Sequence, residues 1–146
     1  MEKIELKIFI GMSRALNKIN RATNKVYTKH GLTSGQFAVL EALYHKGDLS
    51  VGDVQEKILS TSGTIPVIVK NLEKEGFLER RNDEIDKRRF ILHITQKGRE
   101  LMDIVYPENE AIIISMISIW NKEEQEQILN YMKKLRGTED EKNDKR

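Results

Sequence analysis

The chain has 146 residues, of which 38% are hydrophobic and 33% are charged, a balance typical of one soluble, helix-rich domain. Its longest apolar stretch is too short to span a bilayer, its first eleven residues lack the pattern of a signal peptide, and the absence of cysteine excludes disulfides and thiolate metal sites. We therefore expect a cytoplasmic protein, and a net charge of only +2 means that binding to a polyanion must depend on local charge placement.

The first predicted helix spans Ile4 to Lys29 and ends at Gly31. Its apolar residues recur at helical spacing, with lysines and arginines between them. A capping box then predicts a second helix, because the side chains of Thr33 and Gln36 can each satisfy a backbone N–H group at a helix start. This helix should stop before Gly47.

Two short helices follow in the middle of the chain. Ser50 and Asp53 repeat the capping signature and open the first, and the second is predicted from Ser62 to Glu75. Pro66 would break the interior of a helix, but it is tolerated in the first turn, where most N–H groups lack an intrahelical partner. It therefore places the start of this helix close to Ser62 or Gly63.

Two short strands and a charged turn come next. The predicted strands are Phe77 to Arg81 and Phe90 to Ile94, and the second has apolar residues at every other position, Phe90, Leu92 and Ile94, on one buried face. The segment between them, "NDEIDKRR", is dense in both signs of charge. The pattern indicates a β-hairpin with a charged tip.

The remaining chain is predicted to be helical up to a polar tail. Thr95 begins a helix that Pro107 should kink or interrupt, and Asn121 and Glu124 resemble a cap before a last amphipathic helix. We expect the tail, residues 138–146, to be disordered. The middle helices already supply a core, so the apolar faces at both ends of the chain favour an intersubunit bundle over ordinary core packing.

Two short helices joined by a Ser/Gly turn and followed by a charged hairpin are typical of a winged helix-turn-helix. The second helix would present its N-terminal end to the DNA major groove, where the hydroxyls of Thr61, Ser62 and Thr64 suit phosphates and base edges. The hairpin can enter the adjacent minor groove, with Asp86 close enough to Arg88 to pair with it and fix its direction. Two alternatives stay open: the hydroxyls can be simple caps, and the hairpin can be a solvated turn.

The segments "SGTIPVIVKNLEKEGFLERR" and "DEIDKRRFILHITQKGREL" resemble the recognition helix and wing of the MarR family of bacterial transcriptional regulators. Three family patterns are matched, namely D-x-x-D-[RK]-R by Asp83, Asp86, Lys87 and Arg88, L-E-x-x-G by Leu72, Glu73 and Gly76, and L-T-x-x-G by Ile94, Thr95 and Gly98. The similarity in layout extends to residue 137.

The resemblance implies a mainly α fold with a small β-hairpin wing, in which residues 33–94 form the DNA-binding core and residues 1–32 and 95–137 form dimerisation helices. It also implies a homodimer on a pseudo-palindromic site in double-stranded DNA, and repression relieved by a small aromatic or phenolic effector. No cofactor is expected. Pro66 and Val67 stand where the family usually has polar or basic residues, so we expect apolar contacts with thymine methyl groups there.

The candidate sites fall into three groups. The residues expected to contact DNA are Ser34, Thr61, Ser62, Thr64, Pro66, Val67, Lys70, Asn71, Asp86, Lys87, Arg88 and Arg89. The residues expected at the dimer interface are Ile8, Met12, Leu16, Ile113, Met116, Ile117, Trp120, Ile128 and Met132. Arg14 is a candidate for holding an anionic ligand, whereas His30, His45 and His93 lie on separate predicted elements and indicate no metal site.

Enzyme activity is not expected, because the sequence has no nucleophile elbow, phosphate-binding glycine loop or HExxH motif. The alternative to a DNA-binding regulator is a winged-helix module that binds a protein partner through the same helix and wing. The two differ in salt dependence, since only a protein that neutralises several phosphates loses DNA affinity steeply with added salt.

Overall fold

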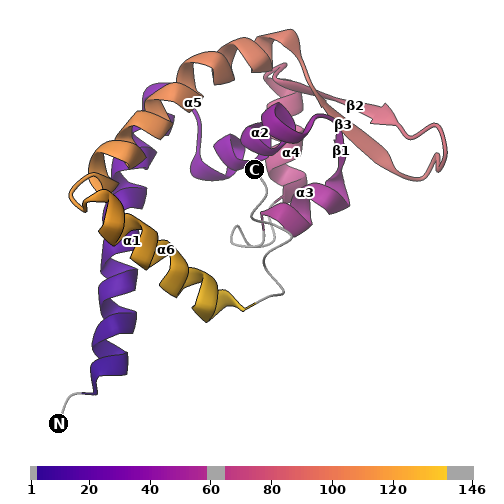
Figure 1. Cartoon of the computed structure of the whole chain (residues 1–146). Helices are drawn as coiled ribbons and strands as arrows, with labels where there is room; N and C mark the ends of the chain where they lie inside the picture. Colours follow the sequence, from indigo (N-terminus) through magenta and orange to yellow (C-terminus); the bar gives the residue numbers. More distant parts are fainter. Residues whose placement is uncertain (1–2, 59–64, 138–146) are drawn as a thin grey trace.

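The computed structural model describes residues 3–58 and 65–137, and most of these are helical (Figure 1). The elements are α1 (Ile4–Lys29), α2 (Ser34–Lys46), β1 (Leu49–Ser50), α3 (Val51–Lys57), α4 (Ile65–Lys74), β2 (Leu78–Asn82), β3 (Phe90–Ile94), α5 (Gln96–Ile117) and α6 (Lys122–Arg136). Within the described residues, no helix is both long and apolar enough to cross a membrane.

The helix starts follow the predicted capping residues. Thr33 Oγ1 accepts the N–H of Gln36 at 3.1 Å, and Gln36 Oε1 accepts the N–H of Thr33 at 3.0 Å. Equivalent capping boxes start α3 and α6, and Thr95 Oγ1 caps α5 by accepting the Gly98 N–H at 3.1 Å. Local side-chain chemistry therefore fixes where four of the helices begin.

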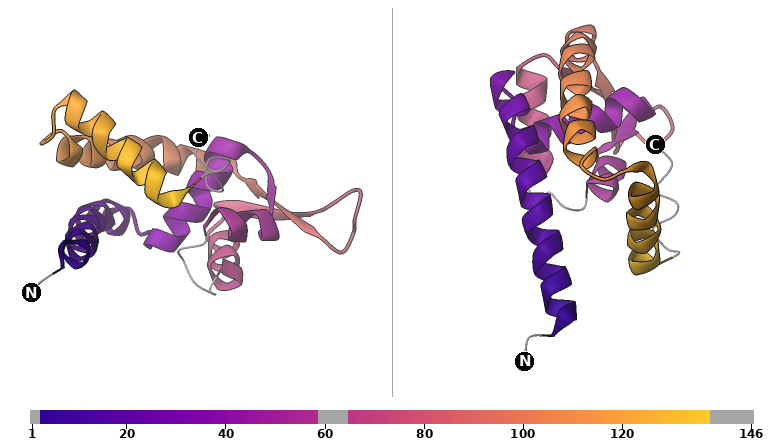
Figure 2. Two further views of the ribbon diagram at one scale, coloured as in Figure 1. Left: turned by 60° about the horizontal axis from the view of Figure 1, so that its bottom comes forward. Right: turned by 60° about the vertical axis from the view of Figure 1, so that its left-hand side comes forward.

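The core lies where α2, α3, α4 and the first half of α5 meet a three-stranded antiparallel sheet of order β1-β3-β2. We call α2, α3, α4 and this sheet the head. Its fully buried side chains include Leu40, Leu43, Val54, Val69, Leu72, Leu78, Leu92, Met102 and Val105. The β2–β3 hairpin, which we call the wing, projects from the head, and the first part of α1 extends away from it (Figure 2).

Three details of the sheet differ from the sequence-based expectation. The first strand of the wing begins at Leu78, because the N–H of Phe77 instead closes the end of α4 on the Leu72 carbonyl at 3.0 Å. Phe90 was expected on the buried face but is 45% exposed, since it pairs with Asn82 beyond the edge of the core. Strand β1 was missed because two residues are too short to show an alternating pattern.

Helix α4 ends as predicted, at a glycine. Gly76 has a φ of +81°, and its N–H bonds to the Glu73 carbonyl at 3.0 Å, next to the closure made by Phe77. This left-handed turn at the helix end favours glycine, which has no Cβ to clash. The predicted start of the helix at Ser62 lies outside the described residues.

Of the two outcomes expected at Pro107, a kink or an interruption, the interruption is wrong, because α5 continues through this residue. Proline cannot donate to the carbonyl four residues earlier, so the helix lacks one hydrogen bond at Asp103. The surrounding packing offsets this loss: Met102 and Val105 are buried in the core on one side, and Asn109 is buried on the other.

Candidate nucleic-acid interface

Helix α4 divides into a buried and an exposed face. Ile65, Val69 and Leu72 pack into the core, whereas Pro66, Val67, Lys70 and Asn71 are exposed. These exposed positions are all four of the described α4 residues that the sequence assigned to DNA contact. The other three candidates on this helix start, Thr61, Ser62 and Thr64, lie outside the described residues.

Contacts from the wing and α5 hold α4 at its C-terminal end. Arg80 of β2 pairs with Glu73 at 3.6 Å, and Lys97 Nζ donates to the Glu75 carbonyl at 2.7 Å. Thr95 Oγ1 donates to the Gly76 carbonyl at 2.6 Å. The orientation of α4 is therefore linked to the wing and to the start of α5.

The wing tip is a compact turn built by its own aspartates. Asp83 Oδ1 accepts the N–H of Ile85 at 3.0 Å and so braces the turn. Asp86 Oδ1 accepts the backbone N–H of Arg88 at 3.1 Å and its Nε at 3.3 Å. The sequence-predicted pair is thus present, and it leaves the Arg88 side chain 92% exposed.

The other predicted cations are distributed around this turn. Lys87 and Arg89 are exposed beside Arg88, and the Arg89 N–H bonds to the Asp86 carbonyl at 3.0 Å. Ser34, the first residue of α2, is exposed as well. All the DNA-contact candidates that the structure describes are therefore accessible, apart from Asp86, which is partly covered by the turn that it holds.

The predicted interface residues on the terminal helices are exposed or half-buried within one chain. Ile8, Leu16, Ile113 and Met132 are exposed, and the remaining five are half-buried, namely Met12, Met116, Ile117, Trp120 and Ile128. No described residue of α6 is buried. Sequence analysis missed further exposed apolar residues on the same helices, although they share the same stretches: Ile4, Leu6, Phe9, Ile10, Ile114, Leu129 and Leu135.

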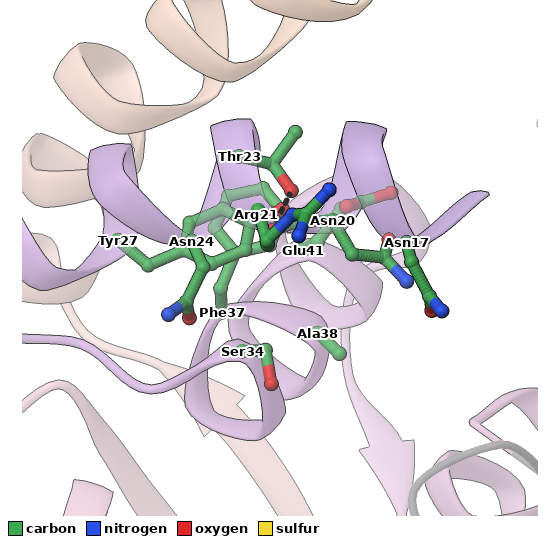
Figure 3. Close-up of a pocket in the computed structure, with 10 residues that line it drawn as sticks. All are labelled: Asn17, Asn20, Arg21, Thr23, Asn24, Tyr27, Ser34, Phe37, Ala38 and Glu41. Atoms are coloured by element: carbon green, nitrogen blue, oxygen red, sulfur yellow. Dashed lines mark hydrogen bonds between the residues drawn. The ribbon is translucent and has the colours of Figure 1, made fainter. Parts of the chain in front are cut away.

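A groove that was not foreseen lies between α1 and α2 (Figure 3). It encloses about 870 Å³ and is lined by Asn17, Asn20, Arg21, Thr23, Asn24, Tyr27, Ser34, Phe37, Ala38 and Glu41. Arg14 is not among these lining residues. The spacing of Asn17, Asn20 and Asn24 along one helical face was the available signal in the sequence.

The walls of the groove combine an apolar floor with polar edges. The rings of Tyr27 and Phe37 stack with centroids 4.3 Å apart. Burial raises the pKa of the Tyr27 hydroxyl, which donates to Asn109 Oδ1 of α5 at 2.7 Å. The groove therefore combines aromatic groups in its floor with amide and guanidinium groups at its edges.

The histidines are engaged separately. His30 Nε2 lies 3.2 Å from Glu108, and His93 Nδ1 lies 2.7 Å from Asp48. The ring of His45 meets Tyr106 edge-on at 4.6 Å. Among the described residues, no three side chains of metal-binding type are grouped together.

Residues 21–105 match the protein family described as "Transcriptional regulator SarA/Rot". Over 135 residues the chain is also 41% identical to the HTH-type transcriptional regulator MhqR of Bacillus subtilis, covering 92% of this chain and 93% of that protein. The chain belongs to the SarA/Rot family of transcriptional regulators. It is a DNA-binding regulator of the MarR type, as the sequence patterns predicted, and the family favours DNA binding over a protein-interaction module.

Solved structures show that this SarA/Rot family member has the winged-helix fold of MarR regulators. AbsC, a MarR family regulator from Streptomyces coelicolor, superposes with a TM-score of 0.83 at 17% identity, over 92% of this chain and 93% of AbsC. BpsR from Bordetella bronchiseptica, studied for regulation of its DNA binding by 6-hydroxynicotinic acid, gives a TM-score of 0.83 at 23% identity, over 94% and 99% of the two chains.

Proposed function

We propose that this regulator is a homodimeric repressor that binds a pseudo-palindromic operator and is released by a small aromatic effector. The observation that carries the proposal is the exposure, on one head, of both the outer face of α4 and a wing arginine oriented by its own aspartate. Two such heads related by a two-fold axis would suit two half-sites of duplex DNA. Acting on chromosomal DNA, the protein would work in the cytoplasm.

The proposed reading surface combines three kinds of contact. Pro66 and Val67 would touch thymine methyl groups in the major groove, because they offer no hydrogen bond, whereas Lys70 and Asn71 would bind phosphates or base edges. Arg88 would enter the minor groove, flanked by Lys87 and Arg89 on the phosphates. Ser34, Thr61, Ser62 and Thr64 would add hydroxyl and helix N-terminal contacts to the backbone.

The proposed dimer is supported by the apolar faces of the terminal helices. A helix of 15 residues with no buried side chain, such as α6, gains little from packing on its own chain. Helix α1 and the end of α5, which both carry exposed apolar residues, lie side by side away from the wing (Figure 1). A second copy that covers these faces would complete the hydrophobic burial.

The proposed effector site is the groove between α1 and α2. Tyr27 and Phe37 would hold an aromatic ring, and Arg21 with the three asparagines would bind a carboxylate, phenolate or hydroxyl. BpsR, whose DNA binding 6-hydroxynicotinic acid regulates, offers a precedent for a hydroxylated aromatic acid. Arg21 thereby replaces Arg14 as the favoured anion-binding residue.

DNA binding is tested by fluorescence anisotropy on an operator selected from random duplexes. We expect affinity to fall linearly with salt on a log–log scale, with a slope that reflects several released counterions. Lys70→Ala should flatten this slope by about one unit, because it removes one phosphate contact. A slope near zero would instead support a protein-interaction module.

The effector site is tested by thermal-shift screening with hydroxylated aromatic acids and quinones. A molecule that raises the melting temperature should lose this effect in Arg21→Ala and keep it in Arg14→Ala, the matched variant on the same helix. The reverse pattern would return the site to Arg14. If the two variants changed the rise in melting temperature by the same amount, the molecule would bind elsewhere.

A further inference from the structure

The end of α1 is attached to the middle of α5 by a short set of polar contacts. Tyr27 Oη donates to Asn109 Oδ1 at 2.7 Å, and these residues are only 8% and 5% exposed. The adjacent carboxylate of Glu108 lies 3.4 Å from Lys29 Nζ and 3.2 Å from His30 Nε2. We call these contacts the latch. The Tyr27–Asn109 hydrogen bond is buried, and such a bond is strongest where water is excluded.

The latch lies at a weak point of α5. Pro107 immediately precedes Glu108 and removes the helical hydrogen bond to the Asp103 carbonyl, which is a common cause of helix bending. Before this point Met102 and Val105 are fixed in the core. After it, α5 leaves the head and carries exposed residues such as Ile114. The latch thus fixes the turn of α5 that directly follows Pro107, where the helical hydrogen bond is missing.

We propose that the latch sets the angle of α5 at Pro107, with Tyr27 as the positioning residue that couples the groove to this angle. The ring of Tyr27 forms part of the groove wall, while its hydroxyl holds α5. A molecule that displaces the ring therefore acts on the same side chain that fixes the helix. The inference deepens the proposed function, because in a homodimer the angle of α5 determines the separation of the two heads.

The angle can be measured within one chain, because the protein contains no cysteine. Glu84→Cys at the wing tip and Asn130→Cys on α6 place two nitroxide labels on exposed positions. Helix α6 reports on the end of α5, since Gln125 Nε2 donates to the carbonyl of Ile117, the last residue of α5, at 3.4 Å. Labelled chains diluted into excess unlabelled chain give the intrachain distance by pulsed dipolar electron paramagnetic resonance, whatever the oligomeric state.

Tyr27→Phe keeps the ring and removes only the hydroxyl, so the wing-to-α6 distance distribution should broaden or shift. Tyr44→Phe is the matched control. The Tyr44 hydroxyl also donates to α5, at Asp103 Oδ1, but on the head side of Pro107. Its loss should leave the distribution unchanged. An unchanged distribution in Tyr27→Phe, or equal broadening in both variants, would overturn the proposal.

A second variant separates the effect of the latch on the angle of α5 from its effect on stability. Tyr27→Phe leaves the buried Asn109 without its donor, whereas Tyr27→Phe with Asn109→Leu replaces both partners by apolar groups and should recover much of the lost stability. The distribution should stay broad in this double variant, because the directional bond is still absent. If the double variant recovered the wild-type distance distribution as well as the stability, the hydrogen bond would contribute only to stability and would not set the angle of α5. Sedimentation of the same samples tests the dimer independently, so the two proposals can fail separately.

Discussion

Arg88 is held by a carboxylate that contacts it twice, through its backbone N–H and through its Nε. A long side chain on an exposed turn would otherwise lose much rotamer freedom on entering a groove. Asp86 reduces that loss because it already restricts the Arg88 side chain in the free protein, although it also brings a negative charge close to the DNA. Whether orientation or repulsion dominates decides the sign of its effect on affinity.

We expect Asp86→Ala to weaken binding to the selected operator, because it frees Arg88. Glu84→Ala is the matched control: it removes an exposed acid from the same tip and should tighten binding slightly by ordinary electrostatics. Arg88→Ala should cost on the order of tenfold in affinity, and Asp86→Ala should add little to it. Fluorescence anisotropy at fixed salt measures the affinities of the wild type, the two single variants and the double variant. Tighter binding by Asp86→Ala would support the alternative that the wing tip is only a solvated turn.

Glu108 gives a pH dependence whose sign follows from its contacts. The hydrogen bond with His30, aided by the Lys29 ammonium, holds the pKa of this carboxyl below its ordinary value. Its contribution to stability is therefore present above the unfolded-state pKa of about 4.3 and is lost as the pH falls through the folded-state value.

Urea unfolding between about pH 6 and 3 should show this loss directly. The free energy of unfolding of the wild type should fall more steeply with acid than that of Glu108→Gln, while above about pH 5 the wild type should be more stable by a constant amount. Glu110→Gln, the next acid along α5, controls for the removal of one charge. Parallel curves for the wild type and Glu108→Gln would show that these contacts contribute nothing to folding.

At the scale of elements, α5 meets the turn between α4 and β2 at a glycine, Gly98. A Cβ at Gly98 would lie 2.1 Å from the Phe77 carbonyl oxygen and 2.9 Å from Ile94 Cγ1. The backbone of α5 therefore approaches the turn after α4 more closely than any other residue type allows. This explains in physical terms the glycine of the L-T-x-x-G pattern.

Gly98→Ala should destabilise the fold by about 1–3 kcal/mol or more, because backbone must move to admit the methyl group. Gly52→Ala is the control, since its added Cβ would meet only Ser50 Oγ at an ordinary 3.8 Å. In a helix that change should be neutral or stabilising by up to about 1 kcal/mol. Thermal and urea unfolding of both variants provide the comparison, and equal stability of the two would contradict the close approach.

Those elements with strong local signals were the ones that the sequence predicted. Capping boxes at Thr33, Ser50 and Asn121 located three helices because the signal is contained within four residues. The interruption of α5, one of the two outcomes expected at Pro107, does not occur because the contacts that stabilise the helix around it come from residues far away in the chain. The groove escaped prediction for the same reason: it exists only where α1 and α2 meet. Local chemistry sets boundaries, whereas tertiary packing decides continuity and cavities.

At the scale of the whole molecule, we expect the terminal helices to decide assembly. We expect sedimentation of the full chain to give a dimer at micromolar concentration, and removal of residues 138–146 to leave this unchanged. Leu16→Lys should shift the equilibrium toward monomer, because it places a charge on an apolar face, at a residue that is 57% exposed in one chain. Lys18→Ala, on the same helix, should sediment as the wild type does. A monomeric wild type would refute the proposed architecture.

The absence of any buried side chain in α6 has a thermodynamic consequence. If burial of this helix comes from a second copy, unfolding and dissociation become one linked equilibrium, and the melting temperature rises with protein concentration by mass action. A regulator present in few copies per cell would then have a smaller margin against unfolding and proteolysis than the same regulator after induction. Its abundance would thereby contribute to its own persistence, independently of any ligand or operator.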